Sequence, residues 1–288
     1  GALGRAVGGS ARGGGPRAAA SPRPGARLAS APWASGRVSA PGPPRTATPL
    51  RRAPVAVVPD PALLVPPAAP DEARRWLAAQ GVPRDGAPLI GVAVRRWFPP
   101  RPRLVPNHVR ARLRRRPARL DADSLRLAAL LAETLDRVVA ANGARVLFLP
   151  SYRAPHEGDV AMCEAIASRM RSTARDVLTL DDPALYKGVA AELDLLLGGR
   201  MHPTIFAASV GTPIVGLAYN AKFHGFFELL GRSDRLLDVG DFLAGEQVEA
   251  LFELVQGGLA ETRSTQDRID ALTEDLRSFN RALLRDLP

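Results

Sequence analysis

The sequence predicts an α/β protein built on a doubly wound, mainly parallel sheet, and two observations carry this prediction. Short apolar segments without polar alternation recur between residues 88 and 239, which is typical of strands buried on both faces. A helical pattern separates each segment from the next, and strands that alternate with helices form parallel sheets. The length of 288 residues allows one large or two modest domains.

Residues 1–54 precede this pattern and differ in composition. Residues 1–70 hold 14 of the 27 prolines, nine arginines and one acid, and so carry +8 of the formal net charge of +10. A glycine-rich segment broken this often by proline cannot form a regular helix or an interior strand. We expect residues 1–54 to be a poorly ordered segment and residues 55–288 to form the α/β domain, which is itself nearly neutral. No specific nucleic-acid partner is expected.

Caps and stop signals divide the domain into its elements. Asp181 or Asp182 can cap the helix that follows them, the helix from residue 71 begins with acidic residues, and Asn142-Gly143 is a stop signal. Apolar residues of the segment after Asp121 fall on one helical face, which makes this the clearest helix. We predict helices at 71–80, 121–142, 158–170, 182–193, 223–230 and beyond 245, and strands at 88–94, 145–149, 176–180 and 236–239.

The segment 193–222 predicts one complete βαβ unit. An apolar strand runs into Gly198-Gly199, a short helix ends at Gly211-Thr212-Pro213, and a second apolar strand follows. The first strand leads to Arg200 and His202, and the second leads to residues 219–222, which include Lys222. Because parallel strands end at the same edge of a sheet, a guanidinium, an imidazole and an ammonium should meet there beside a helix N-terminus. This edge is a predicted anion site.

Lysine occurs only at positions 187 and 222, in a chain that otherwise uses arginine. A compact ammonium can transfer a proton where a guanidinium cannot, so Lys222 at a strand end is a functional candidate. Lys187 lies in the predicted helix 182–193 and is interpreted as a surface residue.

Other reactive residues favour structural roles. Cys163 is the only cysteine, lies among apolar residues of a predicted helix and is interpreted as a packing residue of a protein from a reducing compartment. No Cys or His cluster has the spacing of a zinc site, and no metal is expected. The glycine patterns of phosphate and dinucleotide loops are missing. His156 follows a strand end and is a secondary candidate for phosphate or nucleotide binding.

Several motifs together resemble one family, the polysaccharide pyruvyl transferases. The motifs are Arg200-Met201-His202, Gly211-Thr212-Pro213, Tyr219-Asn220-Ala221-Lys222 and the aromatic helix 223–231. The resemblance extends over about residues 55–241 and implies a Rossmann-like fold that corresponds to the carboxyl-terminal half of a GT-B-like fold. It also implies that the amino-terminal half of the family is missing or degraded in this chain.

The resemblance implies that pyruvate is transferred from phosphoenolpyruvate to a sugar as a ketal, without a metal or organic cofactor. We expect His202 and Lys222 to be catalytic: His202 as general acid and base, and Lys222 to neutralise the leaving phosphate. Arg200 would grip the carboxylate or phosphate, and Arg95 would hold the second anionic group. Tyr219 and Asn220 complete the predicted substrate-binding residues.

The expected partners are phosphoenolpyruvate and a sugar of a cell-surface polysaccharide or its lipid-linked oligosaccharide precursor. We expect a cytoplasmic protein, and the arginine-rich segment 95–119 is a candidate for peripheral contact with the inner face of the membrane. Two alternatives stay open. One is a GT-B-type glycosyltransferase that uses a nucleotide sugar, and the other is an inactive, truncated remnant that only binds.

Overall fold

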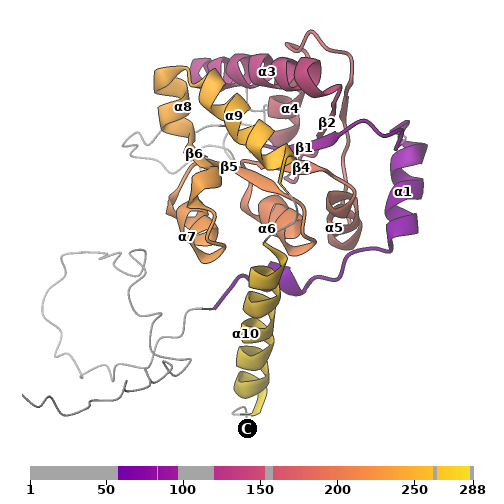
Figure 1. Cartoon of the computed structure of the whole chain (residues 1–288), viewed down its shortest axis with the longest axis vertical. Coiled ribbons are helices and arrows are strands. Elements are labelled where there is room, and N and C mark those ends of the chain that lie inside the picture. Colours follow the sequence, from indigo (N-terminus) through magenta and orange to yellow (C-terminus); the bar gives the residue numbers. More distant parts are fainter. Residues whose placement is uncertain (1–57, 83, 97–119, 153–157, 262–264, 286–288) are drawn as a thin grey trace, which may run out of the picture. The chain divides into compact units, whose positions relative to one another are not determined.

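A six-stranded parallel sheet lies at the centre of the computed structural model, which describes residues 58–82, 84–96, 120–152, 158–261 and 265–285 (Figure 1). The strand order is β3-β2-β1-β4-β5-β6, and every neighbouring pair is parallel. The strands are β1 (Leu89–Ala93), β2 (Arg145–Phe148), β3 (Arg175–Val177), β4 (Leu195–Gly198), β5 (Ile214–Ala218) and β6 (Leu236–Asp238). The predicted doubly wound, Rossmann-like α/β fold is therefore confirmed.

The central strands are apolar throughout because helices cover both of their faces. All residues of β1, β4 and β5 are buried. The registers Val92↔Leu197 and Leu197↔Val215 place branched side chains beside each other across these three strands. These strands do not alternate polar with apolar residues, because neither of their faces is exposed to solvent.

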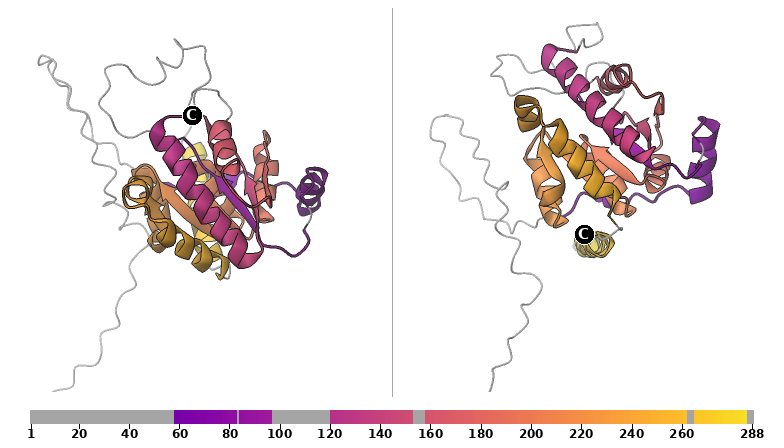
Figure 2. Two further views of the ribbon diagram at one scale, coloured as in Figure 1. Left: turned by 90° about the horizontal axis from the view of Figure 1, so that it is seen from above. Right: turned by 45° about the horizontal axis from the view of Figure 1, so that its top comes forward.

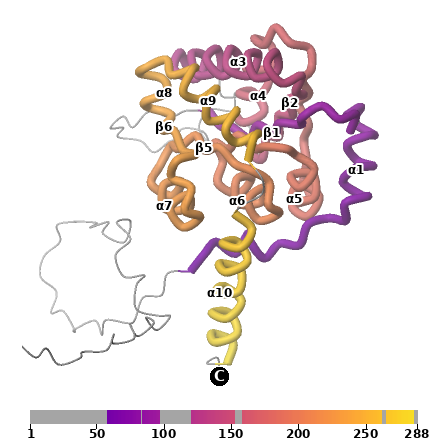
Figure 3. Tube along the Cα trace, viewed as in Figure 1, coloured from indigo at the N-terminus to yellow at the C-terminus, as the bar shows by residue number. Residues whose placement is uncertain are grey.

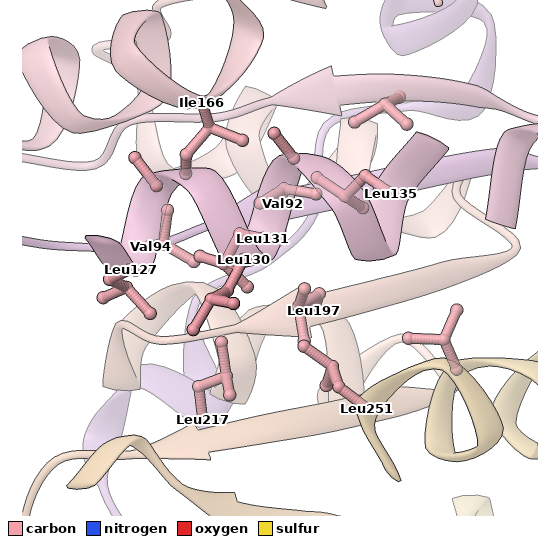
Figure 4. Packing of buried hydrophobic residues seen from close by; sticks show 14 of the residues in the cluster. Val92, Val94, Leu127, Leu130, Leu131, Leu135, Ile166, Leu197, Leu217 and Leu251 are labelled. Atoms are coloured by element: carbon pink, nitrogen blue, oxygen red, sulfur yellow. The ribbon is translucent and has the colours of Figure 1, made fainter. Parts of the chain in front are cut away.

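Four helices cover one face of the sheet, as Figures 1 and 2 show. They are α3 (Ala122–Asn142), α4 (Asp159–Ala167), α8 (Val239–Gly245) and α9 (Val248–Leu259). Leu127, Leu131 and Leu135 of α3 pack with Val92 and Leu197 of the sheet in one buried cluster (Figure 4). The clearest helix of the sequence therefore contributes the centre of this core layer.

The opposite face is covered by α5 (Pro183–Ala191), α6 (Met201–Ser209) and α7 (Ala221–Leu229). A second core includes residues from these helices and from α1 (Pro70–Ala79) and α10 (Gln266–Arg285). Helix α10 contacts α6, and Figure 3 shows it continuing beyond that helix. The described residues also include two 3₁₀ turns, η2 (Pro61–Leu64) and η3 (Ser233–Arg235). None of the described helices combines the length and apolarity that a membrane crossing requires.

The predicted helix boundaries follow from capping chemistry. Asp121 caps α3 by accepting a hydrogen bond from the Ser124 N–H at 3.0 Å, and Gly143 ends this helix at a φ of 63°. Asp182 caps α5 by accepting from the Ala184 N–H at 2.8 Å. Asp182 is one of the two acids predicted as the possible cap of this helix, and the structure confirms it, whereas Asp121 was predicted as the first helical residue and is the cap instead.

Two interpretations of the sequence need correction. Strand β3 covers residues 175–177 instead of 176–180, and Leu178 and Leu180 are buried in the second core. Lys187 is buried, with 3% of its surface exposed, because the segment that contains η2 packs against α5. The interpretation of Lys187 as a surface residue was wrong. The predicted boundary between residues 54 and 55 lies outside the described residues.

Candidate functional site

The strand order reverses between β1 and β4, and this position defines the candidate site. Strand β2 lies on one side of β1, and β4, which follows β3 in the chain, lies on the other. In open parallel sheets, ligands bind at the carboxyl ends of the strands that flank such a reversal. In this sheet these ends lead to Arg95 after β1 and to Arg200 after β4.

Gly199 keeps the two strand ends together up to this edge. Its N–H donates to the Ala93 carbonyl oxygen at 2.8 Å. A Cβ atom at position 199 would lie 3.3 Å from the Cα atom of Val94, which is a backbone atom that cannot move aside independently. The close approach therefore favours glycine, and it brings the segments that carry Arg95 and Arg200 side by side.

The Arg200 guanidinium forms an ion pair with Asp159, the first residue of α4. Its Nε donates to Asp159 Oδ2 at 2.8 Å, and its Nη2 donates to Oδ1. The Asp159 side chain is completely buried, and only 13% of the Arg200 side chain is exposed. Burial raises the pKa of Asp159 above its ordinary value, although the hydrogen bonds from Arg200 oppose this shift. Sequence analysis predicted Arg200 but missed Asp159.

Two tyrosines complete the surroundings of the arginines. The Tyr152 N–H donates to Asp159 Oδ2 at 3.1 Å, and the Tyr152 ring centroid lies 5.6 Å from the Arg200 Cζ atom. The Arg95 Cζ atom lies 4.8 Å from the centroid of the Tyr219 ring, in the geometry of a cation–π contact. The predicted residues Arg95 and Tyr219 are therefore in contact.

A small cavity lies beneath Arg95 and Tyr219. It is lined by Val94, Gly199 and apolar residues of α3, β5 and α8, and its volume of about 10 Å³ is close to what a single water molecule needs. A ligand of the size of phosphoenolpyruvate cannot enter it.

His202 lies on the exposed side of the first turn of α6. Its side chain is 70% exposed, and its Nε2 atom lies 4.0 Å from the Asp60 carboxylate. Asp60 also caps η2 by accepting from the Ala62 N–H at 2.9 Å. The predicted acid/base residue is thus accessible to solvent, and Asp60 is a carboxylate neighbour that sequence analysis did not predict.

Asn220 and Lys222 begin α7. The Asn220 side chain caps this helix by accepting from the Lys222 N–H at 3.1 Å, and the Lys222 residue is exposed. His224, which was not predicted as functional, lies 3.2 Å from Asp238. Asn220 therefore has a structural task, and a binding role for it stays a prediction.

Some of the predicted site residues contact one another in the structure, and others do not. Arg95 and Arg200 both act electrostatically on Asp159, and Arg95 contacts Tyr219. His202 and Lys222 follow the neighbouring strands β4 and β5 at the same edge, but no contact between them is present among the described residues. His156 and segment 97–119 lie outside the described residues.

The described residues contain no group of three His, Cys, Asp or Glu side chains that could hold a metal ion. Cys163 is buried, and burial raises the pKa of its thiol. This placement confirms its interpretation as a packing residue.

The fold and the arginine-bearing edge define a Rossmann-like α/β protein with a cationic site at the reversal of its strand order. The sequence model of the family described as polysaccharide pyruvyl transferase matches residues 49–221, which is more than half of the chain. The chain belongs to this family. The match includes Arg95, Asp159, Arg200 and His202 and ends one residue before Lys222.

Solved structures of sugar-metabolising proteins are similar to the chain in fold. A mutant O-GlcNAc transferase from Thermobaculum terrenum is 15% identical, with 68% of this chain and 33% of that chain covered and a TM-score of 0.40. A family 9 glycosyl transferase from Veillonella parvula is 15% identical, with 72% and 53% covered and a TM-score of 0.41. A UDP-GlcNAc 2-epimerase from Methanocaldococcus jannaschii is 12% identical, with 71% and 50% covered and a TM-score of 0.43.

The chain thus spans between a third and about half of the length of these proteins. No curated protein matches it in sequence.

Proposed function

We propose that the protein is a polysaccharide-modifying transferase that moves the pyruvyl group of phosphoenolpyruvate onto a sugar as a ketal. The acceptor is a sugar of a cell-surface polysaccharide or of its lipid-linked precursor. Membership of the family supports the transferase class. The observation that carries the donor assignment is the placement of two guanidiniums at the reversal of the strand order: Arg200, which is paired with Asp159, and Arg95, which lies against the Tyr219 ring.

The charges of this edge suit a small anion with two acidic groups. Arg200 is paired with Asp159, and Arg95 adds a second positive charge at the same sheet edge, so the cluster of Arg95, Arg200 and Asp159 keeps a net positive charge. His202 and Lys222 lie on the first turns of α6 and α7, where the positive ends of the helix dipoles also favour anions. Phosphoenolpyruvate carries a phosphate and a carboxylate and would complement this arrangement.

The ion pair changes the role that Arg200 can have. Asp159 already engages Nε and Nη2 of Arg200, so a ligand could grip this edge of the guanidinium at two points only by displacing Asp159. In our proposal Arg200 therefore stabilises the donor mainly through its fixed charge. Arg95, held against the Tyr219 ring, makes the direct contact with an anionic group.

The proposed reaction balances without a further reactant. His202 donates a proton to the methylene carbon of the donor, a sugar hydroxyl attacks the adjacent carbon, and the phosphate leaves as the second hydroxyl closes the ketal. The two hydroxyl protons replace the proton given by His202 and protonate the phosphate. Lys222 neutralises charge on the departing phosphate. The exposure of His202 leaves room for both substrates beside its ring.

Phosphate release from phosphoenolpyruvate in the presence of an acceptor glycan tests this proposal. Removal of a general acid typically costs 10²- to 10⁴-fold, so His202→Ala should lower the rate by at least about 100-fold. His224→Ala is the matched control, because His224 is also exposed and pairs with a carboxylate, Asp238, and its rate should stay within about twofold of the wild type.

Equal rates for His202→Ala and the wild type would remove His202 from the mechanism. Binding of a uridine diphosphate sugar, but not of phosphoenolpyruvate, would favour a glycosyltransferase instead.

A further inference from the structure

Asp159 is a buried carboxylate that takes part in no chemical step of the proposed mechanism. It is completely buried, yet it accepts hydrogen bonds from Nε and Nη2 of Arg200 and from the Tyr152 N–H. Burying a carboxylate is costly, and burial is the largest influence on its pKa. A carboxylate kept in such a place depends on the guanidinium that faces it.

The position of Asp159 in the fold connects three strand ends. Tyr152 follows β2, Arg95 follows β1, and Arg200 follows β4, and all three interact with the one carboxylate. Asp159 comes from the start of α4, 41 residues before Arg200 in the chain. Helix α4, which packs in the first core, therefore holds the side chain of Arg200, which follows the central strand β4.

The two-point geometry fixes the guanidinium in orientation as well as in position. An arginine side chain has several rotatable bonds, and a single contact would leave the plane of its guanidinium free to turn. Binding through both Nε and Nη2 removes this freedom before a ligand arrives. A charge that is fixed in advance stabilises a bound anion without reorganising at the moment of binding.

The geometry points to Asp159 as the positioning residue of the donor site: it holds Arg200 in the orientation in which Arg200 stabilises a phosphate or carboxylate of the ligand. The inference rests on the proposed function for the identity of the donor. This role differs from that of a purely structural ion pair. A positioning residue affects ligand binding only through the side chain that it holds, whereas a structural ion pair affects it through the stability of the fold.

Four proteins test this distinction: the wild type, Asp159→Asn, Arg200→Met and the double variant. The readout is the dissociation constant of phosphoenolpyruvate, measured by titration calorimetry. Each single variant should bind at least about tenfold more weakly, which is the scale on which partners of a binding group act. The double variant should bind no more weakly than Arg200→Met alone, because Asp159 has no effect once Arg200 is gone.

Asp176→Asn is the matched control. Arg145 pairs with Asp176 at 2.8 Å, but Arg145 begins β2 and so lies at the opposite edge of the sheet. This variant breaks another Arg–Asp ion pair, one whose side chains are more exposed than those of Arg200 and Asp159, and its affinity for phosphoenolpyruvate should stay within about twofold of the wild type. Equal weakening in Asp176→Asn and Asp159→Asn would mean that loss of stability, not positioning, lowers the affinity.

A second readout does not depend on the donor. The Nε–H of Arg200, assigned in nuclear magnetic resonance spectra by its loss in Arg200→Met, should exchange with solvent at least about tenfold faster in folded Asp159→Asn than in the wild type. Equal exchange, wild-type affinity of Asp159→Asn or additive losses in the double variant would each overturn the inference. If the wild type binds no phosphoenolpyruvate, the donor assignment fails, and the exchange rate alone decides whether Asp159 holds Arg200.

Discussion

The buried Lys187 offers the sharpest test of how the segment that contains η2 is attached to the sheet domain. Its Nζ donates to the carbonyl oxygens of Leu63 at 3.0 Å and Val65 at 2.6 Å, both more than 120 residues away in the chain. Hydrogen bonds to charged groups contribute about 1.5–3 kcal/mol each, so the pair sets an upper limit of about 3–6 kcal/mol. Relief of the burial cost of the ammonium offsets part of this. We expect Lys187→Met to lower the free energy of unfolding by about 2–3 kcal/mol.

The other lysine provides the control. Lys222→Met removes an exposed ammonium and should change the free energy of unfolding by no more than about 0.5 kcal/mol. Urea unfolding followed by circular dichroism measures both variants, and an unchanged slope with denaturant shows that the same surface is exposed on unfolding. A Lys187→Met protein as stable as the wild type would refute the view that these two bonds hold the segment.

The lowered pKa of Lys187 also predicts how the free energy of unfolding changes with pH. Burial lowers the pKa of Lys187 below its ordinary value, so between the folded and unfolded pKa values the unfolded chain binds more protons. Stability must therefore rise with pH in this window, up to the ordinary lysine pKa of about 10.4. The stability of the wild type relative to Lys187→Met should grow as the pH rises through this window toward about 10.4. A difference that shrinks with pH would contradict a lowered pKa.

Two further predictions concern local packing and capping. A Cβ atom at Gly198 would overlap the Thr204 side chain, so Gly198→Ala should destabilise the fold by about 1–3 kcal/mol in thermal unfolding. Gly240→Ala is the control, because no atom lies within 4 Å of the added Cβ, and it should be neutral or slightly stabilising. Equal melting temperatures of the two variants would refute the overlap. Asp182→Ala removes the cap of α5 and should cost about 1 kcal/mol in urea unfolding, and no loss would show that the Ala184 N–H finds another acceptor.

The sheet could be predicted from the sequence because its signals are local. Apolar runs of strand length, a cap such as Asp121 and a stop such as Gly143 each specify an element within a few residues. The candidate edge followed from the same logic, since parallel strands have their carboxyl ends on one side. Arg200 could therefore be assigned to it before its surroundings were known, and the resemblance to the family added Arg95.

The partners of these residues could not be predicted, because they come from distant parts of the chain. Nothing near Lys187 indicates that residues 63–65 will pack over it, and nothing near Arg200 indicates that Asp159 will face it. The exposure of His202 depends in the same way on where the segment around Asp60 lies. Tertiary contacts, not local patterns, decide whether a charged side chain is buried or exposed.

Whether a charged side chain has a partner from a distant part of the chain affects what the candidate site can do. An arginine without a partner would be a flexible cation, and the sequence alone supports only that description. With Asp159 at its inner edge, Arg200 becomes a fixed charge, while His202 on the exposed side of the same helix start keeps access to solvent. One short segment, 200–202, thus combines a guanidinium fixed by an ion pair with an exposed imidazole. In the proposed reaction these neighbouring residues would hold the anion and transfer the proton.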